Sequence, residues 1–218
     1  MTPEAYQELC KKAADQPETF WGEVAERLAW FKKWDKVKNT SFRKPVSVKW
    51  YEGGELNASF NCLDRHLEKR GSKTALIFEP DQPNAPSRKI TYRELHEEVC
   101  RFANVLKKHG VKKGDCVTLY MPMIPETVVA MLACARIGAV HSAVFGGFAP
   151  DSIADRILNC ESTFVVVADE GRRGGKTIAL KKNIDQALAK TPAVKTVLVV
   201  TNTGGAVTMT GGRDAWLH

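Results

Sequence analysis

The chain has 218 residues, of which 44% are hydrophobic and 26% charged, and this globular composition excludes an intrinsically disordered or fibrous protein. No apolar run reaches the roughly 18 residues that a membrane span needs, and the N-terminus lacks the apolar segment of a secretory signal. We therefore expect no membrane association and a cytoplasmic location.

The formal net charge is +7, and much of the surplus lies between residues 171 and 190. That region has a single acidic residue, Asp185, and six basic ones: Arg172, Arg173, Lys176, Lys181, Lys182 and Lys190. A local basic excess favours a polyanionic ligand. A purely solvated basic face is the alternative that composition leaves open.

The six cysteines show no C-x-x-C pair and no local zinc spacing. Most stand in apolar surroundings, and free cysteine is among the most buried residue types. We interpret them as reduced core thiols at Cys10, Cys62, Cys100, Cys116, Cys134 and Cys160.

The first 60 residues predict a helical and irregular arm that packs on the main body. Thr2 precedes Pro3-Glu4, a combination that suits a helix N-terminus. A second helix is expected over 17–37, where aromatic residues recur near helical spacing and would dock the arm. Residues 39–60 read as irregular, with a short strand near 46–51.

Residues 61–218 alternate between strand and helix patterns, which predicts an α/β portion with a mostly parallel sheet flanked by helices. Continuous apolar strands such as 164–168 suit a sheet buried on both faces. Strands are expected at 73–80, 88–92, 115–122, 139–146, 162–169 and 194–200. Helices are expected at 61–71, 91–110, 125–138, 149–160 and 181–192, with a capping box at Thr91 and Glu94. The tail reads as a loop in which 213–218 begins a helix.

Two glycine-containing segments follow strands of the predicted sheet, where parallel α/β sheets bind ligands. The first glycine segment consists of Phe145, Gly146 and Gly147, and the second of Arg173, Gly174, Gly175 and Lys176. Each alone is a weak signal, because a strand-to-helix connection often needs glycine. Two of them after neighbouring strands favour a shared cleft.

The second glycine segment resembles the end of a Walker loop at Gly175-Lys176-Thr177. The Walker pattern needs a glycine where Glu170 stands. An ordinary solvated turn and a phosphate site of another kind both remain open at this point.

The sequence contains neither H-E-x-x-H nor G-x-S-x-G. His141 falls within a predicted strand, where we expect a satisfied core histidine. The remaining histidines are His66, His96 and His109, expected on polar helix faces, and His218. We predict no catalytic residue and no metal site in this chain.

Four segments resemble AMP-forming acetyl-CoA synthetases of the adenylate-forming superfamily. They are "YMPMIPE" (120–126), "ACARIGAVHS" (133–142), "VFGGF" (144–148) and "ADEGRRGGK" (168–176). The resemblance spans almost the whole chain and implies the first part of the large N-terminal domain of that fold. Propionyl-CoA synthetase is similar enough to remain an alternative.

The resemblance implies a two-step reaction, in which acetate and ATP give acetyl-adenylate and CoA then takes the acetyl group. The family's phosphate loop, of the type T-S-G-S-T-G-x-P-K-G, is absent here, as is its C-terminal domain. The resemblance therefore implies an N-terminal fragment that is inactive alone, with the ATP and Mg²⁺ sites outside this chain.

The resemblance also implies part of a CoA site. Arg173 and Lys176 of the second glycine segment would contact the 3′-phosphate and adenine end of CoA, and the first glycine segment would line the tunnel for the pantetheine arm. Lys176 stands where arginine is common, and lysine lacks the bidentate fork of arginine.

The partners implied are the small molecules acetate, ATP and CoA, with neither nucleic acid nor a membrane. The alternative from another class is a non-catalytic basic α/β module that binds nucleic acid. Aromatic residues do not interleave with the basic residues of 171–190, as stacking on single strands would require. The sequence carries no signal of oligomeric state.

Overall fold

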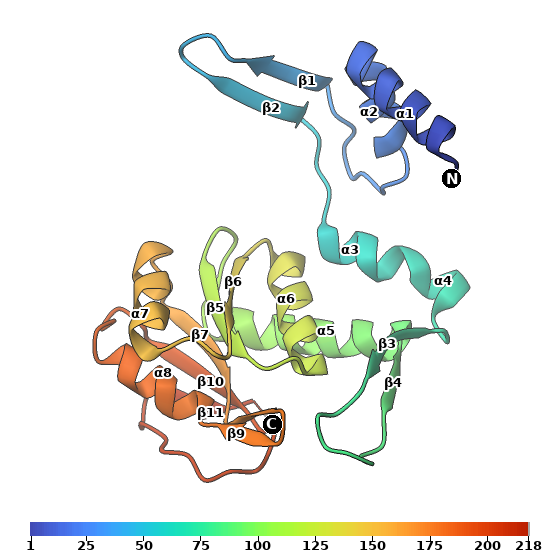
Figure 1. Cartoon of the computed structure of the whole chain (residues 1–218). Helices are drawn as coiled ribbons and strands as arrows, with labels where there is room; N and C mark the ends of the chain where they lie inside the picture. Colours follow the sequence, from blue (N-terminus) through green and yellow to red (C-terminus); the bar gives the residue numbers. More distant parts are fainter. Residues whose placement is uncertain (218) are drawn as a thin grey trace. The chain divides into compact units, whose positions relative to one another are not determined.

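The computed structural model describes residues 1–217, so His218 lies outside the described residues, as does the end of the helix expected at 213–218. The chain divides into two compact units, Met1–Arg65 and the remainder from His66 (Figure 1). Each unit is described by itself. Within the described residues, no helix combines the length and apolarity that crossing a bilayer requires.

The first unit combines three helices with an antiparallel hairpin. Its elements are α1 (Pro3–Asp15), α2 (Pro17–Ala25), β1 (Lys36–Ser41), β2 (Ser47–Glu52) and α3 (Ala58–Cys62). The helix expected over 17–37 is wrong beyond Ala25. At the end of α2, the Ala25 carbonyl accepts from both the Trp30 indole N–H (2.9 Å) and the Leu28 amide (3.0 Å).

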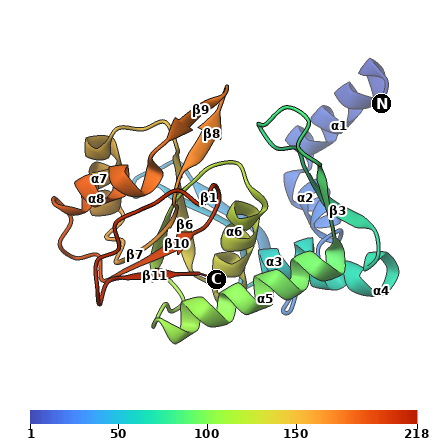
Figure 2. The same cartoon turned by 90° about the horizontal axis from the view of Figure 1, so that it is seen from below.

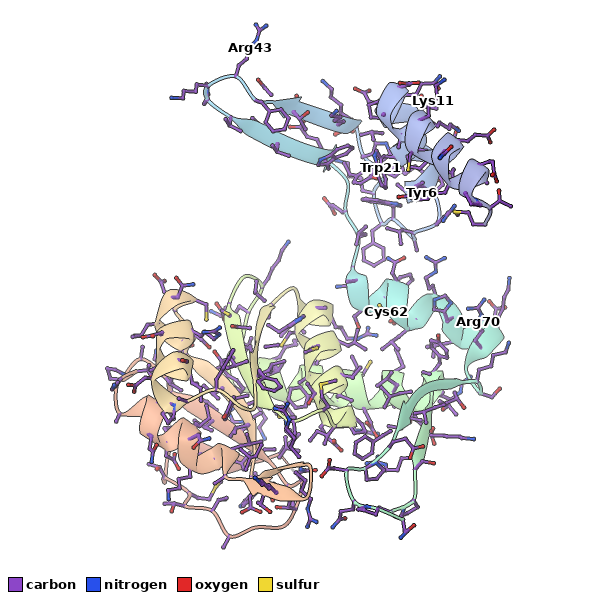
Figure 3. All side chains as sticks on the ribbon, in the orientation of Figure 1. Tyr6, Lys11, Trp21, Arg43, Cys62 and Arg70 are labelled. Atoms are coloured by element: carbon purple, nitrogen blue, oxygen red, sulfur yellow. The ribbon has the colours of Figure 1, made fainter. Side chains whose placement is uncertain are left out.

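The aromatic residues of this unit form a cluster of rings rather than a helical face. Trp30 lies 4.9 Å from Trp34 and 5.4 Å from Tyr51, between ring centroids. The Tyr51 hydroxyl donates to the Trp21 carbonyl (3.0 Å), which joins the hairpin to α2. Figure 3 labels Trp21 in this unit. The near-helical spacing of these aromatic residues in the sequence therefore reflects the packing of their rings in the tertiary structure, not a helix.

The single helix expected over 61–71 is also wrong, because the segment is broken. α3 is followed by a 3₁₀ turn at Asp64–His66 and by α4 (Leu67–Arg70). Leu63 leaves helical geometry, with φ −121° and ψ −68°, and its side chain is buried. Burial of this one side chain interrupts the helical run that local pattern suggests.

The second unit is built on a five-stranded, wholly parallel sheet in the order β11-β10-β7-β5-β6. Its strands are β5 (Cys116–Met121), β6 (Val140–Phe145), β7 (Phe164–Ala168), β10 (Thr196–Val200) and β11 (Asp214–Trp216). The α/β fold class with a mostly parallel sheet is confirmed. β7 is buried at every position, as expected for a strand covered on both faces.

Helices cover both faces of this sheet. The helices are α5 (Tyr92–Lys108), α6 (Pro125–Ile137), α7 (Pro150–Asn159) and α8 (Leu180–Leu188). α5 packs against α6 and α7 against α8, and the two views place these pairs on opposite sides of the sheet (Figures 1 and 2). Ahead of α5 lies the antiparallel pair β3 (Thr74–Phe78) and β4 (Arg88–Thr91). The predicted capping box is present, with Thr91 and Glu94 exchanging side-chain-to-backbone hydrogen bonds.

Three further expectations are wrong. Residues 214–216 form strand β11 beside β10 instead of beginning a helix. His141 is exposed, because β6 is the edge strand of the sheet. Of the six cysteines, Cys134 is buried, whereas Cys10 and Cys62 are exposed and the rest are half-buried.

A buried ion-pair network holds β11 in place. The Lys181 side chain is fully buried, and its Nζ lies 2.9 Å from Asp214 and 2.7 Å from Asp185. Burial by itself would raise the pKa of Asp214. Hydrogen bonds from Arg213, the Thr210 amide and Lys181 overcome that effect and lower the pKa below its usual value. The carboxylate therefore stays charged inside the fold.

Lys181→Met should lower the free energy of unfolding by about 3 kcal/mol, because it removes one partner of a buried pair. Lys190→Met is the matched control, since the Lys190–Asp151 pair is exposed, is screened by solvent and should contribute little. Urea denaturation of both variants at pH 7 measures the difference. Equal losses in the two would contradict the role assigned to the buried network.

The lowered pKa of Asp214 also sets the direction of a pH effect. A group whose pKa is lower in the folded state stabilises the fold above its unfolded pKa, about 3.9 for aspartate. That stabilisation should be lost as the pH falls below about 4. Asp214→Asn should show a weaker acid dependence of the urea midpoint than the unsubstituted chain.

Candidate functional site

The candidate site lies at the carboxyl ends of β5, β6 and β7. β5 pairs with β6 on one side and with β7 on the other, so the chain changes direction across the sheet between these strands. Connections diverge at such a point, which is where parallel α/β sheets form a crevice. Both glycine segments follow strands that end there.

The first glycine segment is held by a buried tyrosine from the neighbouring strand. The Tyr120 hydroxyl is 3.1 Å from the carbonyl oxygens of both Gly146 and Phe148, and it accepts from the Asn183 amide (3.2 Å). Burial raises the pKa of Tyr120, against which the Asn183 hydrogen bond acts, so this hydroxyl stays protonated as a donor. Tyr120 and Asn183 were missed from the sequence. An isolated tyrosine within an apolar strand was the only available signal.

The Phe145 side chain is about half exposed (56%) and folds back over Gly147. A Cβ on Gly147 would lie 2.7 Å from Cε1 of the ring, so the bare backbone permits this position. The Arg173 guanidinium carbon lies 5.1 Å from the centroid of the same ring, a cation–π contact. The structure thus brings the two predicted segments together through one stacked pair.

The second glycine segment is the tip of a hairpin rather than a plain loop. β8 (Gly171–Arg173) pairs with β9 (Lys176–Ile178) through a two-residue turn. Gly174 and Gly175 have φ of +56° and +75°, which primed hairpin turns require and glycine tolerates best. A turn was one of the alternatives that the sequence left open for this segment, and the short strands beside it were not foreseen.

Arg173 and Lys176 are register partners across the hairpin, so their side chains share one face. Both residues are exposed, and within residues 1–217 neither forms an ion pair. Like charges directly opposite each other on a hairpin destabilise it. An anion between them would relieve that repulsion, which makes this face an anion-binding arrangement.

A cavity of about 860 Å³ opens beside these segments, and all of the first glycine segment lines it together with Arg173. Its apolar wall includes Met121, Met123, Ile124 and Ile178. Gly174, Gly175 and Lys176 stand outside this cavity, at the exposed tip of the hairpin. The site therefore has an apolar hollow and a basic rim.

Two further residues that the sequence did not point to fix the surroundings. Leu180 packs beneath Gly146 of the first segment and beneath Gly171 at the base of the β8–β9 hairpin, because Cβ atoms on these glycines would lie 3.4 and 3.2 Å from its methyl carbons. The buried Asp169 carboxylate accepts from the amides of Thr203 and Gly204 and holds the loop after β10 against the cavity.

The described residues offer no catalytic or metal-binding set. Among residues 1–217, no three His, Cys, Asp or Glu side chains converge so that they could hold a metal ion. Burial raises the pKa of Cys134 to about 12, and burial together with the neighbouring Cys160 does the same for Cys116. Neither thiol is thereby a nucleophile at neutral pH. The residues present do not fit a resident Mg²⁺ ion.

Comparisons with known proteins identify the relatives of the chain. Residues 63–215 match the family model of the AMP-binding enzymes, and residues 6–62 match that of the acetyl-coenzyme A synthetase N-terminus.

The curated relatives include acetyl-coenzyme A synthetases of Bdellovibrio bacteriovorus, 65% identical over 98% of this chain, and Parvibaculum lavamentivorans, 60% identical over 98%. The chain spans 33% of the length of each. Among solved structures, acetoacetyl-CoA synthetase from Streptomyces lividans superposes with a TM-score of 0.84 at 26% identity. That match covers 94% of this chain and 31% of the other.

Tyr120→Phe should lower the free energy of unfolding by about 1–2 kcal/mol, because the Gly146 and Phe148 carbonyls and the Asn183 amide lose a buried partner. Tyr6→Phe, at an exposed position, should leave the free energy of unfolding nearly unchanged. Urea denaturation compares the two. An unchanged midpoint in Tyr120→Phe would show that the hydroxyl does not support the loop.

Proposed function

Because the chain belongs to the AMP-binding enzyme family, we propose that it forms the CoA-recognising part of an AMP-forming acetate–CoA ligase. Such a ligase joins acetate and ATP as acetyl-adenylate and then transfers the acetyl group to CoA. Relatives named acetyl-coenzyme A synthetase that match nearly the whole chain support this assignment. The proposed location is the cytoplasm, where these substrates are available.

The observation that carries the proposal is the basic face of the β8–β9 hairpin beside an apolar cavity. Arg173 and Lys176 lie opposite each other at the rim, and they suit the phosphates at the nucleotide end of CoA. Arg173 is also held by its stack on Phe145. A guanidinium fixed in this way loses less freedom when it binds an anion.

The cavity accounts for the other end of the ligand. Pantetheine is a thin, largely apolar arm, and the half-exposed Phe145 ring and the uncovered backbone of Gly146 and Gly147 offer a wall of matching character. We assign the first glycine segment to this arm and the second to the phosphates. ATP and Mg²⁺ belong to steps that no residue of this chain is proposed to perform.

Two other assignments are less well supported. A propionate-specific ligase would share this half of the site, because the residues proposed here contact CoA rather than the acyl group. A nucleic-acid-binding module would need several stacking rings among the basic residues. The one ring at the hairpin, Phe145, is already covered by Arg173.

The 218-residue chain should bind CoA more tightly than dephospho-CoA, which lacks only the 3′-phosphate. Arg173→Ala and Lys176→Ala should each weaken CoA binding about tenfold or more, since each removes a charged partner of the phosphate. Amide chemical-shift titration by NMR measures both affinities and identifies the residues affected.

Lys182→Ala is the matched control, because Lys182 is exposed on α8 and belongs to the same basic region without being part of the hairpin. It should change CoA affinity by less than about twofold, because exposed charges at a distance are screened. Equal affinity for CoA and dephospho-CoA would refute the phosphate assignment. Binding of single-stranded RNA with a steep salt dependence, and no response to CoA, would favour the nucleic-acid module instead.

A further inference from the structure

A carboxylate from a distant loop contacts the tip of the β8–β9 hairpin. Asp81 follows β3 in the exposed connection to β4. Its Oδ1 accepts from the Gly174 amide (3.1 Å) and its Oδ2 from the Gly175 amide (3.2 Å). One carboxylate therefore satisfies both amides of the turn, across more than ninety residues of sequence.

The geometry of the turn explains why these amides need a partner. In a two-residue hairpin, the backbone groups of the flanking pair bond to each other, and the two central N–H groups point away from the ladder. Successive backbone N–H groups of this kind form a concave donor site for an anion. Asp81 supplies that anion from within the chain.

The tip has little other support. Cβ atoms added to Gly174 or Gly175 would meet nothing within 4 Å, so the turn is not packed against a neighbour. The hairpin has three residues in each strand, and an isolated hairpin is at best marginally stable in water. Its base is anchored where Gly171 packs against Leu180, and next to the turn Arg173 stacks on Phe145. Asp81 ties down the opposite end.

We propose that Asp81 is a positioning residue for CoA recognition: by holding both turn amides, it fixes the directions in which Arg173 and Lys176 project toward a phosphate. This inference rests on the proposed function of the hairpin. Asp81 lines the cavity, but both of its carboxylate oxygens are engaged by the turn amides. Its effect is to order the two basic side chains before binding, so that less freedom is lost when the phosphate arrives.

The alternative is that Asp81 competes with the ligand phosphate. A carboxylate in an anion-binding turn could occupy the place of the ligand phosphate, and removing it would then strengthen CoA binding. Both Asp81 oxygens are engaged by amides of the turn itself, whereas the charges of Arg173 and Lys176 stand beside the turn, where they can meet the ligand. The geometry therefore favours positioning over competition.

Three variants of the 218-residue chain test the proposal. Asp81→Ala removes both acceptors, whereas Asp81→Asn keeps one oxygen acceptor and removes the charge. Glu97→Ala is the matched control, because it removes the same charge from an exposed position on α5 that does not line the cavity. Amide hydrogen exchange at Gly174 and Gly175 and NMR titrations with CoA and dephospho-CoA provide the readouts.

Asp81→Ala should speed exchange at both glycines and weaken CoA binding about fivefold to tenfold, as expected for the loss of two hydrogen bonds to a charged group. Dephospho-CoA binding should change less than twofold. Asp81→Asn should lie between Asp81→Ala and the unsubstituted chain, and Glu97→Ala should match the latter. Tighter CoA binding by Asp81→Ala, or unchanged exchange and affinity, would overturn the proposal.

Failure of the proposed function gives a different result. If the unsubstituted chain does not distinguish CoA from dephospho-CoA, the phosphate assignment falls, and with it the role of Asp81 in recognition. The exchange data would still decide whether Asp81 holds the turn, since they require no ligand.

Discussion

The candidate site depends on parallel pairing of β5 with β6 on one side and β7 on the other. Parallel strands end at the same edge of a sheet, so segments that follow β6 and β7 must meet there although α7 separates them in sequence. The apolar side chains of these strands lock the register, because a slip of one residue would expose buried positions. The contact between Phe145 and Arg173 is a consequence of this pairing.

The β8–β9 hairpin differs from a Walker loop in the groups that it offers to a phosphate. A Walker loop wraps a phosphate chain with many backbone amides. In this hairpin the turn has only two amides outside the strand pairing, and both donate to Asp81. The recognition proposed here is therefore assigned to two side-chain charges on one face of the hairpin. Glu170, at the position where the Walker pattern requires glycine, accepts from the Thr203 hydroxyl (2.7 Å) and helps to hold the loop after β10.

The parts of the structure that sequence could predict are those that local pattern determines. The apolar run at 164–168 and the Thr91–Glu94 capping box each carry their own physical cause within a few residues. The failures lie where tertiary contact decides. Trp30 contacts the end of α2, and Leu63 leaves helical geometry. Asp214 lies in a strand and pairs with the buried Lys181. The spacing of residues in the sequence shows none of these contacts.

The same division holds within the candidate site. Glycine pairs and adjacent charges could be found because they stand next to each other in the sequence. The side chains that place them could not, because Tyr120, Asp169 and Asp81 act on segments 26 to 94 residues away. The sequence therefore indicated the residues that could contact a ligand, but it did not indicate the residues that orient them.

The start of α8 links the site to the rest of the second unit. Leu180 packs beneath both Gly146 and Gly171, and the next residue, Lys181, is the buried centre of the ion-pair network. The Lys181 amide also donates to the Asp169 carbonyl (3.1 Å) at the end of β7. A shift of this helix would therefore displace the side chain that packs against both Gly146 and Gly171. The buried charges of Lys181 and Asp214, expensive to bring out of water, oppose such a shift because any displacement would leave them poorly paired. The packing beneath the β8–β9 hairpin thus depends on a buried ion pair that does not line the cavity.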